Sequence, residues 1–455
     1  MENSKPETEK QKNRIKLPDD DSALRMRCFQ IAKDLYGDSL PSFVIDRLTV
    51  ELDSIRINGF SSHYILASDL VRYSRQNGFH VCYRGMFPSS LISYFCRISE
   101  INPLPAHYLC NECHHIEIVN TGDNNQRICG YDLPDKTCPE CGALMSATGV
   151  DIMPEVSMGV DFNREPDIIL SFAPQIRKLV VEYIVNRFKN EQVFRAGVKV
   201  ELPDGSTRKA VHPGGIYIVP SGVDISSITQ LRESEKNDDF GLMITEEDFH
   251  NVDKKLKRYD ILVNQELGLL HDLESKTGFS PNKIKTNDIE VLSVFIKTNN
   301  FFMQHFPELY RKAIDEANPQ CFSDLARIDG LMHGVHTWIG NGEELIRSGI
   351  ELKDIISTRD DILSFLVNKG FDKSEAYSIM QNVKIDKGLT QEMIQKMESA
   401  GVPNWYIESC NKIMYVLPLS HCLEYTLVNW KLAYYWLHYP DIYKSIYEKK
   451  GKAIK

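Results

Sequence analysis

Two closely spaced pairs of cysteines constrain the fold of this chain more than any other feature of its sequence. Cys110 and Cys113 form one CxxC pair, and Cys138 and Cys141 form a second pair within CPECG. Two residues between ligands allow both thiolates to reach one ion, and four thiolates complete the tetrahedron that is typical of a structural zinc site. The sequence therefore predicts a zinc-ribbon insert over residues 109–149, with Zn²⁺ as a structural cofactor.

Other cysteines and histidines leave some freedom in this assignment. His114, His115 and Cys129 lie between the two pairs, and each could replace a ligand. The remaining cysteines stand in apolar stretches, which favours buried core positions: Cys28, Cys82, Cys96, Cys321, Cys410 and Cys422.

The start of the chain argues against export. Residues 1–21 are polar and charged, without the apolar core of a signal peptide, and we expect them to form a flexible tail. No stretch approaches the roughly 20 apolar residues that span a bilayer. We therefore expect a cytoplasmic protein with reduced thiols and no membrane partner. The net charge of −10 argues mildly against a general nucleic-acid coat, although a local cationic groove can exist on an acidic protein.

Hydrophobic periodicity predicts an α/β protein whose first half is mixed and whose second half is helical. The spacing suits helices over Ser22–Ile57, and again from Asn264 to the end. An Asp-Gly turn within LPDGS, residues 202–206, predicts a β-hairpin. Short apolar runs predict strands at Tyr64–Leu70, Phe79–Tyr83, Pro166–Phe172 and Gly215–Val219.

A series of characteristic phrases follows one order along the chain. SEINPLPAHYLCNEC and GYDLPDKTCPECG surround the cysteines, and PDIILSFAP, VFRAG, HPGGIYIVP and FSDLARIDGLMHGVHTWIGNGEELI follow them. With shorter phrases they cover roughly residues 50–447 and resemble the PolC-type bacterial DNA polymerase III alpha subunit, a C-family DNA polymerase. The resemblance implies a nucleotidyltransferase-like mixed-sheet palm with a zinc-ribbon insert, followed by a mostly helical fingers domain. The implied parts are palm at 22–108 and 150–263, the insert at 109–149 and fingers at 264–455.

The resemblance also implies a particular chemistry. Polymerases join nucleotides with two metal ions, held by carboxylates grouped on one surface. The family supplies three aspartates, two of them as Asp-x-Asp on a strand, where alternate side chains share a face. Asp167 matches the first aspartate and Asp260 the third, whereas Ile169 stands at the second position. An aliphatic side chain cannot ligate a cation, so we expect weak Mg²⁺ binding and a severe loss of activity. Glu165 has the same strand parity as Asp167 and could supply a carboxylate, although Pro166 interrupts strand pairing there.

The loop that resembles the family's phosphate-binding segment is altered as well. The family pattern resembles SRGSxGSS, and this chain has YRGMFPSS at residues 83–90. Bulky residues in place of small ones block the approach of a phosphate, and proline removes one backbone donor. Each position that resembles a nucleotide, phosphate or template contact could equally be part of the scaffold. These positions are Arg84, Gly85, Ser89, Ser90, Arg195, His212, His333, Trp338, Asn341, Arg359 and Lys387.

Together these features predict a truncated and degenerate relative of the family, impaired or inactive as a polymerase, that binds DNA or a replication partner and binds nucleotide weakly. The first alternative is an active short DNA polymerase or nucleotidyltransferase that uses Asp167 and Asp260, with or without Glu165. The second is a zinc-containing protein-interaction module. Processive replication is not expected. The sequence leaves open the oligomeric state and the process served, whether replication, a mobile element, phage defence or regulation of a polymerase.

Overall fold

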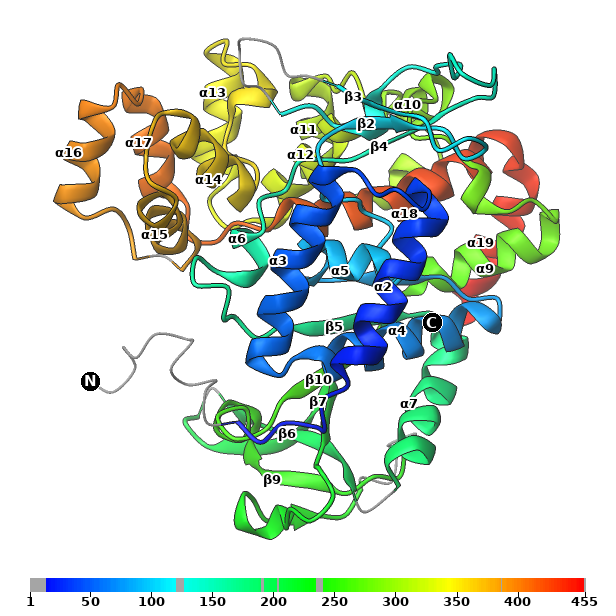
Figure 1. Cartoon of the computed structure of the whole chain (residues 1–455), viewed down its shortest axis with the longest axis vertical. Helices are drawn as coiled ribbons and strands as arrows, with labels where there is room; N and C mark the ends of the chain where they lie inside the picture. Colours follow the sequence, from blue (N-terminus) through cyan, green and yellow to red (C-terminus); the bar gives the residue numbers. More distant parts are fainter. Residues whose placement is uncertain are drawn as a thin grey trace.

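The computed structural model describes residues 14–119, 127–189, 192–202, 204–234, 240–385 and 387–453 (Figure 1). Residues 1–13, which belong to the predicted flexible tail, lie outside this part of the chain. Residues 14–20 follow, and Ile15 forms a parallel bridge with Leu256. Within the described ranges, no helix is long and apolar enough to cross a bilayer.

Three helices open the described chain. The Asp20 side chain caps the first of them by accepting a hydrogen bond from the Ala23 amide at 3.1 Å. Gly59 ends the second with a φ of +67°, a left-handed conformation that suits glycine. The three helices are α2 (Asp21–Tyr36), α3 (Ser42–Asn58) and α4 (Ser61–Gln76).

The prediction of a strand at Tyr64–Leu70 is wrong, because this segment lies within α4. Every residue from Tyr64 to Leu70 is buried, since α4 is enclosed between α2 and the central sheet. A helix that is buried all round lacks the polar face that reveals its period, so its apolar run imitates a strand. The helices predicted over Ser22–Ile57 are confirmed.

A mixed sheet of seven strands forms the palm, in the order β1-β5-β10-β7-β6-β9-β8. β5 and β10 run parallel to each other, while β10 and β7 are antiparallel. The mixed α/β architecture predicted from the sequence is therefore confirmed. The strands are β1 (Val81–Tyr83), β5 (Ile168–Phe172), β6 (Val193–Glu201), β7 (Thr207–Ile218), β8 (Leu231–Arg232), β9 (Ile244–Asp248) and β10 (Arg258–Val263).

β6 and β7 form the hairpin that was predicted around residues 202–206. Their register pairs Glu201 with Thr207, and Gly205 takes a φ of +80° in the turn. The other end of β7 lies beside β10, with Gly215 opposite Asp260. The hairpin therefore carries the start of HPGGIYIVP to the same edge as Asp260.

The cysteine-rich insert forms a second, smaller sheet in the order β3-β2-β4. β2 (His107–Leu109) pairs antiparallel with both β3 (Ile116–Ile118) and β4 (Ser146–Thr148). The insert has a small core of its own, made of Tyr108, Cys110, Cys138 and Met145. Two of the four cysteines are thus part of the small core of the insert.

The chain after β10 is helical, as predicted from Asn264 onward. α18 (Leu419–His438) crosses the centre of the molecule in Figure 1 and contacts β1. It therefore joins the helical part to the palm. The other helices are α5 (Leu91–Phe95), α6 (Glu155–Met158), α7 (Pro174–Phe188), α8 (Phe249–Val252), α9 (Gln265–Thr277), α10 (Ile289–Ile296), α11 (Glu308–Ala317), α12 (Phe322–His333), α13 (Glu343–Arg347), α14 (Arg359–Asn368), α15 (Lys373–Lys384), α16 (Gln391–Ser399), α17 (Asn404–Lys412) and α19 (Pro440–Ala453). Single turns lie at η1 (Phe87–Ser89), η3 (Gly130–Asp132), η5 (Ile225–Ser227), η6 (Pro281–Lys283), η7 (Met303–His305), η8 (Trp338–Gly342) and η9 (Leu352–Asp354).

Candidate functional site

The four cysteines of the two CxxC pairs converge at one point of the insert. Their Sγ atoms all lie within 4.8 Å of one another. The sulfur atoms of Cys110 and Cys141 are 3.4 Å apart, and those of Cys113 and Cys138 are 3.5 Å apart. Zn–S bonds of about 2.3 Å in a tetrahedral site separate the sulfurs by about 3.8 Å, so the cluster fits such an ion. Among the residues that the structure describes, this is the one group of three or more His, Cys, Asp or Glu side chains that could hold a metal.

The three alternative ligands of the insert lie outside this cluster. His114 Nδ1 lies 2.9 Å from the Leu35 carbonyl oxygen, and His115 Nε2 lies 3.5 Å from a carboxylate oxygen of Glu117. Cys129 is half-buried against the main hydrophobic core. The structure therefore brings together the four cysteines of the CxxC pairs and leaves these three side chains elsewhere.

Asp260 and Ile169 are direct neighbours across two parallel strands. The register of β5 and β10 pairs Asp260 with Ile169, and neighbours in register point their side chains to the same face of a sheet. Ile169 also reaches toward the loop after β1, where its Cδ1 lies 3.9 Å from the position that a Cβ on Gly85 would take. A branched hydrocarbon thus fills the space beside the Asp260 carboxylate.

Asp167 precedes β5 and is held by two cations. Its carboxylate lies 3.4 Å from Lys257 Nζ and 3.6 Å from the Arg164 guanidinium, and 46% of its side chain is exposed. Burial raises the pKa of Asp167, but Lys257 and Arg164 outweigh burial and lower the pKa to about 2. The carboxylate is therefore ionised at neutral pH and is already paired within the protein.

Asp260 is also paired with a cation, and its side chain is nearly buried. Its side chain is 9% exposed, and Arg258 Nε lies 2.9 Å from its Oδ1. His212 Nδ1 lies 3.6 Å from the same oxygen, but this nitrogen accepts a hydrogen bond from the Gly215 amide at 2.8 Å. Nδ1 therefore carries a lone pair rather than a proton, in agreement with burial, which lowers the pKa of His212. Arg258 is thus the cation that balances Asp260.

Glu165 belongs to a buried network beside α4. Its side chain is 1% exposed and pairs with Arg14 and with His63 Nε2, the latter at 3.2 Å. His63 Nδ1 in turn lies 2.7 Å from the Tyr259 hydroxyl. Tyr259 and Asp260 are consecutive strand residues, so their side chains point to opposite faces of the sheet. The structure therefore does not bring the Glu165 carboxylate to the Asp260 face.

The loop after β1, which resembles the phosphate-binding segment, is packed against α18. The Gly85 amide donates a hydrogen bond to His421 Nδ1 at 2.8 Å. The hydroxyl oxygens of Ser89 and Ser420 are 2.7 Å apart. Burial lowers the pKa of His421 to about 3, so its ring is neutral and free to accept the bond from Gly85.

The other polar groups of this loop are engaged too. Ser90 Oγ donates to Glu51 at 2.6 Å, and Arg84 Nε donates to the Tyr425 hydroxyl at 2.5 Å. Phe87 is 2% exposed and anchors the loop in the core. The donors that a phosphate cradle would present are therefore satisfied inside the protein.

Three positions of the helical part that resemble nucleotide or template contacts are buried. Trp338 and Asn341 are each 3% exposed, and Asn341 Nδ2 donates to the His336 carbonyl at 3.0 Å. Arg359 is also 3% exposed, and its Nε donates to the Val416 carbonyl at 2.7 Å. These side chains connect turns and helices in this conformation, and Trp338 offers no open face to a base.

The remaining predicted contacts are spread over separate places. The end of β5 and β10 that carries Asp167, Ile169 and Asp260 is called the palm edge. Arg195 on β6 donates to the His212 carbonyl at 2.9 Å, and His212 lies 3.6 Å from Asp260, so both residues lie near the palm edge. His333 is the last residue of α12. Lys387 follows α15, and its backbone amide donates to Asn382 at 3.0 Å.

Several decisive side chains were missed at the level of sequence. Arg258 stands two residues before Asp260 in KRYDIL, so its position along the chain could have marked it as a counter-ion. Lys257 pairs instead with Asp167, 90 positions earlier in the chain. His421 and Tyr425, in contrast, lie 336 and 341 positions away from their partners in the loop. No local pattern connects positions that far apart.

Comparison with known proteins gives two family matches along the chain. Residues 22–206 match the bacterial DNA polymerase III alpha NTPase domain, and residues 257–403 match the bacterial DNA polymerase III alpha subunit finger domain. The DNA polymerase III PolC-type of Caldanaerobacter subterraneus subsp. tengcongensis is 35% identical over 472 residues, which cover 93% of this chain and 34% of that protein. The PolC-type polymerase of Staphylococcus aureus is 34% identical over 471 residues, covering 93% of this chain and 33% of its own length. The chain spans about a third of the length of these curated relatives.

Proposed function

Since this chain belongs to the PolC-type DNA polymerase III family, we propose that it is a catalytically impaired or inactive polymerase relative that binds nucleic acid or a replication partner. The observation that carries the proposal is the pairing of Ile169 with Asp260 at the palm edge. The Zn²⁺ ion of the cysteine cluster is then a structural cofactor, and the cytoplasm is the location that we propose with it.

Two-ion catalysis needs oxygen ligands on both sides of the ions. Here Asp167 and Asp260 remain, and the hydrocarbon of Ile169 stands where a third carboxylate would bridge them. Loss of a group that only supports a ligand costs about 10- to 100-fold in metal affinity or activity, so loss of a ligand itself costs more. The residues present therefore do not fit a two-ion site.

The charges at the palm edge support the same conclusion. Lys257 and Arg164 face Asp167, and Arg258 faces Asp260. A divalent ion would have to displace these cations from carboxylates that they already neutralise. The paired charges of the edge therefore disfavour a divalent metal ion.

The closed loop after β1 supports weak nucleotide binding at most. Its Gly85 amide and its Ser89 and Ser90 hydroxyls are bonded to His421, Ser420 and Glu51, so none of them points to an open cradle. A triphosphate would have to break these bonds before it gained its own. This supports a role in binding a strand or a partner rather than in selecting nucleotides.

Primer extension separates the proposal from an active short polymerase. With Mg²⁺ or Mn²⁺ and a primed template, we expect no incorporation above background. Incorporation that Asp260→Ala abolishes would show a working enzyme built on Asp167 and Asp260. Asp204→Ala in the exposed β6–β7 turn is the matched control, since it removes a carboxylate remote from the palm edge.

DNA binding as a function of salt separates the proposal from a protein-interaction module. Phosphate contacts release counterions, so we expect the affinity for DNA to fall steeply as salt rises. A flat dependence, or no binding at low salt, would favour the zinc-containing interaction module. Because this assay needs no catalysis, it gives a result even when primer extension shows no product.

A further inference from the structure

A pocket lined by arginines lies on elements that do not carry Asp167 or Asp260. It has a volume of about 420 Å³ and is lined by residues of α2, α4 and the end of α5. These three helices are labelled in Figure 1. No acidic side chain of the described residues lines it. Four arginines do, namely Arg27, Arg72, Arg75 and Arg97. On a protein with a net charge of −10, such a concentration of positive charge stands out.

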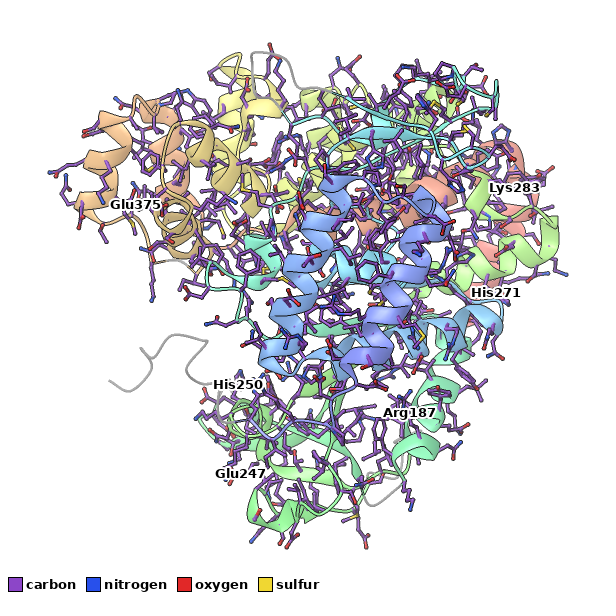
Figure 2. The ribbon with its side chains drawn as sticks, in the orientation of Figure 1. Arg187, Glu247, His250, His271, Lys283 and Glu375 are labelled. Atoms are coloured by element: carbon purple, nitrogen blue, oxygen red, sulfur yellow. The ribbon has the colours of Figure 1, made fainter. Side chains whose placement is uncertain are left out.

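One carboxylate behind the pocket is shared among three guanidinium groups. Asp69 on α4 lies 3.1 Å from Arg27 and 2.9 Å from Arg72. It also pairs with Arg187 of α7, which is labelled in Figure 2. A single negative charge cannot neutralise three positive ones, so Arg27 and Arg72 keep part of their attraction for a further anion.

Arg75 and Arg97 are less neutralised still. Arg75 lies 3.9 Å from Glu100, whose closer partner is Lys431 at 2.6 Å. Arg97 is exposed and makes no ion pair within the described part of the chain. Its backbone has a φ of +52°, a left-handed conformation that residues other than glycine rarely adopt. Arg75 donates to the Arg97 carbonyl at 2.6 Å, which holds this strained turn at the rim.

The floor of the pocket is apolar. Phe95 is fully buried, Cys96 is 3% exposed and Ile31 is half-buried. The Ser68 hydroxyl donates to the Cys96 carbonyl at 2.8 Å, so this polar group at the floor is already satisfied. The pocket therefore combines a charged rim with a hydrophobic base.

We propose that this pocket binds a phosphate ester with an aromatic or apolar body, the class to which nucleoside monophosphates belong. Guanidinium groups bind phosphate oxygens with two parallel hydrogen bonds and also stack on planar rings. The volume falls within the range of small-molecule sites. The site needs no metal ion and does not rest on the proposed function of the palm.

Titration calorimetry of the whole chain with AMP, in the presence of a metal chelator, tests this site. We expect AMP to bind at least about tenfold more tightly than adenosine, because hydrogen bonds between charged groups are strong. Arg97→Gln and Arg72→Gln should each weaken AMP binding about tenfold. Arg25→Gln is the matched control, since Arg25 lies on α2, pairs with Asp53 at 2.8 Å and stays outside the lining.

A second arm identifies the source of the phosphate. A 5′-phosphorylated oligonucleotide that binds more tightly than its unphosphorylated form, with the same dependence on Arg97 and Arg72, supports the site and assigns it to a strand end. AMP binding no tighter than adenosine binding overturns the proposal, as do equal losses in Arg25→Gln and Arg97→Gln. Thermal unfolding of each variant shows whether the fold is kept, and the exposed Arg72 supplies a second test if the Arg97 turn is disturbed.

Discussion

The cysteine cluster and the palm edge both bring candidate metal ligands together, and they differ in what surrounds those ligands. In the cluster, four Sγ atoms meet within 4.8 Å. At the palm edge, the Ile169 hydrocarbon lies beside Asp260, and Asp167 and Asp260 each have a cation of the protein beside them. One region is built to receive a metal, whereas the other already has its charges balanced.

The difference reflects what a metal does in each place. A structural ion contributes its binding free energy to folding, so a small insert with little core depends on it. The palm sheet is held by a large core, so its fold does not need a metal ion at Ile169. Ile169 and the neighbouring cations then make the edge stable in the absence of ions.

The largest expected effect is loss of the cluster. Changing Cys110 and Cys113 to Ser together should unfold the insert, because structural zinc is worth about 10 kcal/mol or more in small zinc domains. Metal content and thermal unfolding measure this. Cys321→Ser removes a half-buried thiol outside the cluster and should leave bound metal unchanged. An insert that stays folded in the double variant would erase the contrast between the two regions.

A second prediction compares how stability depends on pH at the cysteine cluster and at the junction of α18 with the palm. Burial, together with Glu100, raises the pKa of Glu424 to about 7. The folded pKa lies above the ordinary value of about 4.3, so the stability from this group is fully present below that value and is lost as pH rises through about 7. Glu424→Gln should therefore raise the free energy of unfolding by about 2 kcal/mol at pH 8 and by much less at pH 5.

Urea unfolding at the two pH values measures this difference. Glu408→Gln on the exposed side of α17 is the control. The cluster should respond in the opposite sense, because its thiolates must be deprotonated to hold zinc and release it as pH falls. Metal content that does not fall with pH, or a Glu424→Gln effect of equal size at pH 5 and pH 8, would remove this distinction.

A third prediction concerns the lost ligand. Ile169→Asp should raise the affinity of the palm for Mn²⁺ about tenfold over Ile169→Asn, which has a similar shape without the charge. Recovery should be partial, because Lys257 and Arg258 still compete for the carboxylates. Electron paramagnetic resonance of Mn²⁺ measures it. Equal affinities in the two variants would mean that the palm has lost more than one ligand.

The smallest effect is expected from Lys257→Gln. Removing this cation should raise the pKa of Asp167 from about 2 toward its ordinary value. The folded pKa is depressed, so its contribution to stability is present above about pH 4 and is lost as pH falls through about 2. The side chain is nearly half exposed, so the change in stability should stay below about 1 kcal/mol. Carboxyl NMR titration follows Asp167, Lys255→Gln is the control, and an unmoved pKa would contradict the pairing.

Much of this comparison was predictable from the sequence. The CxxC spacing predicted the convergence of four thiolates, because two residues between ligands let both reach one ion. The β6–β7 hairpin followed in the same way from its Asp-Gly turn. The place of Ile169 came from the resemblance to the polymerase family, whose motif carries a second aspartate there.

What the sequence could not predict depends on tertiary contacts. The run Tyr64–Leu70 imitates a strand because α4 is enclosed on several sides. The closure of the loop after β1 depends on His421 and Ser420, which lie on α18 far along the chain. Glu165 has the same strand parity as Asp167, which suggested that it could act as a ligand. In the structure, it pairs with Arg14 and His63 in a separate buried network.

A crystal grown with Mn²⁺, zinc and a nucleoside triphosphate tests the contrast most directly, because anomalous scattering distinguishes the two metals within one molecule. We expect one zinc ion among Cys110, Cys113, Cys138 and Cys141 and no manganese between Asp167 and Asp260. Two manganese ions seated beside Ile169 with a bound triphosphate would contradict the proposal and would identify a working polymerase site.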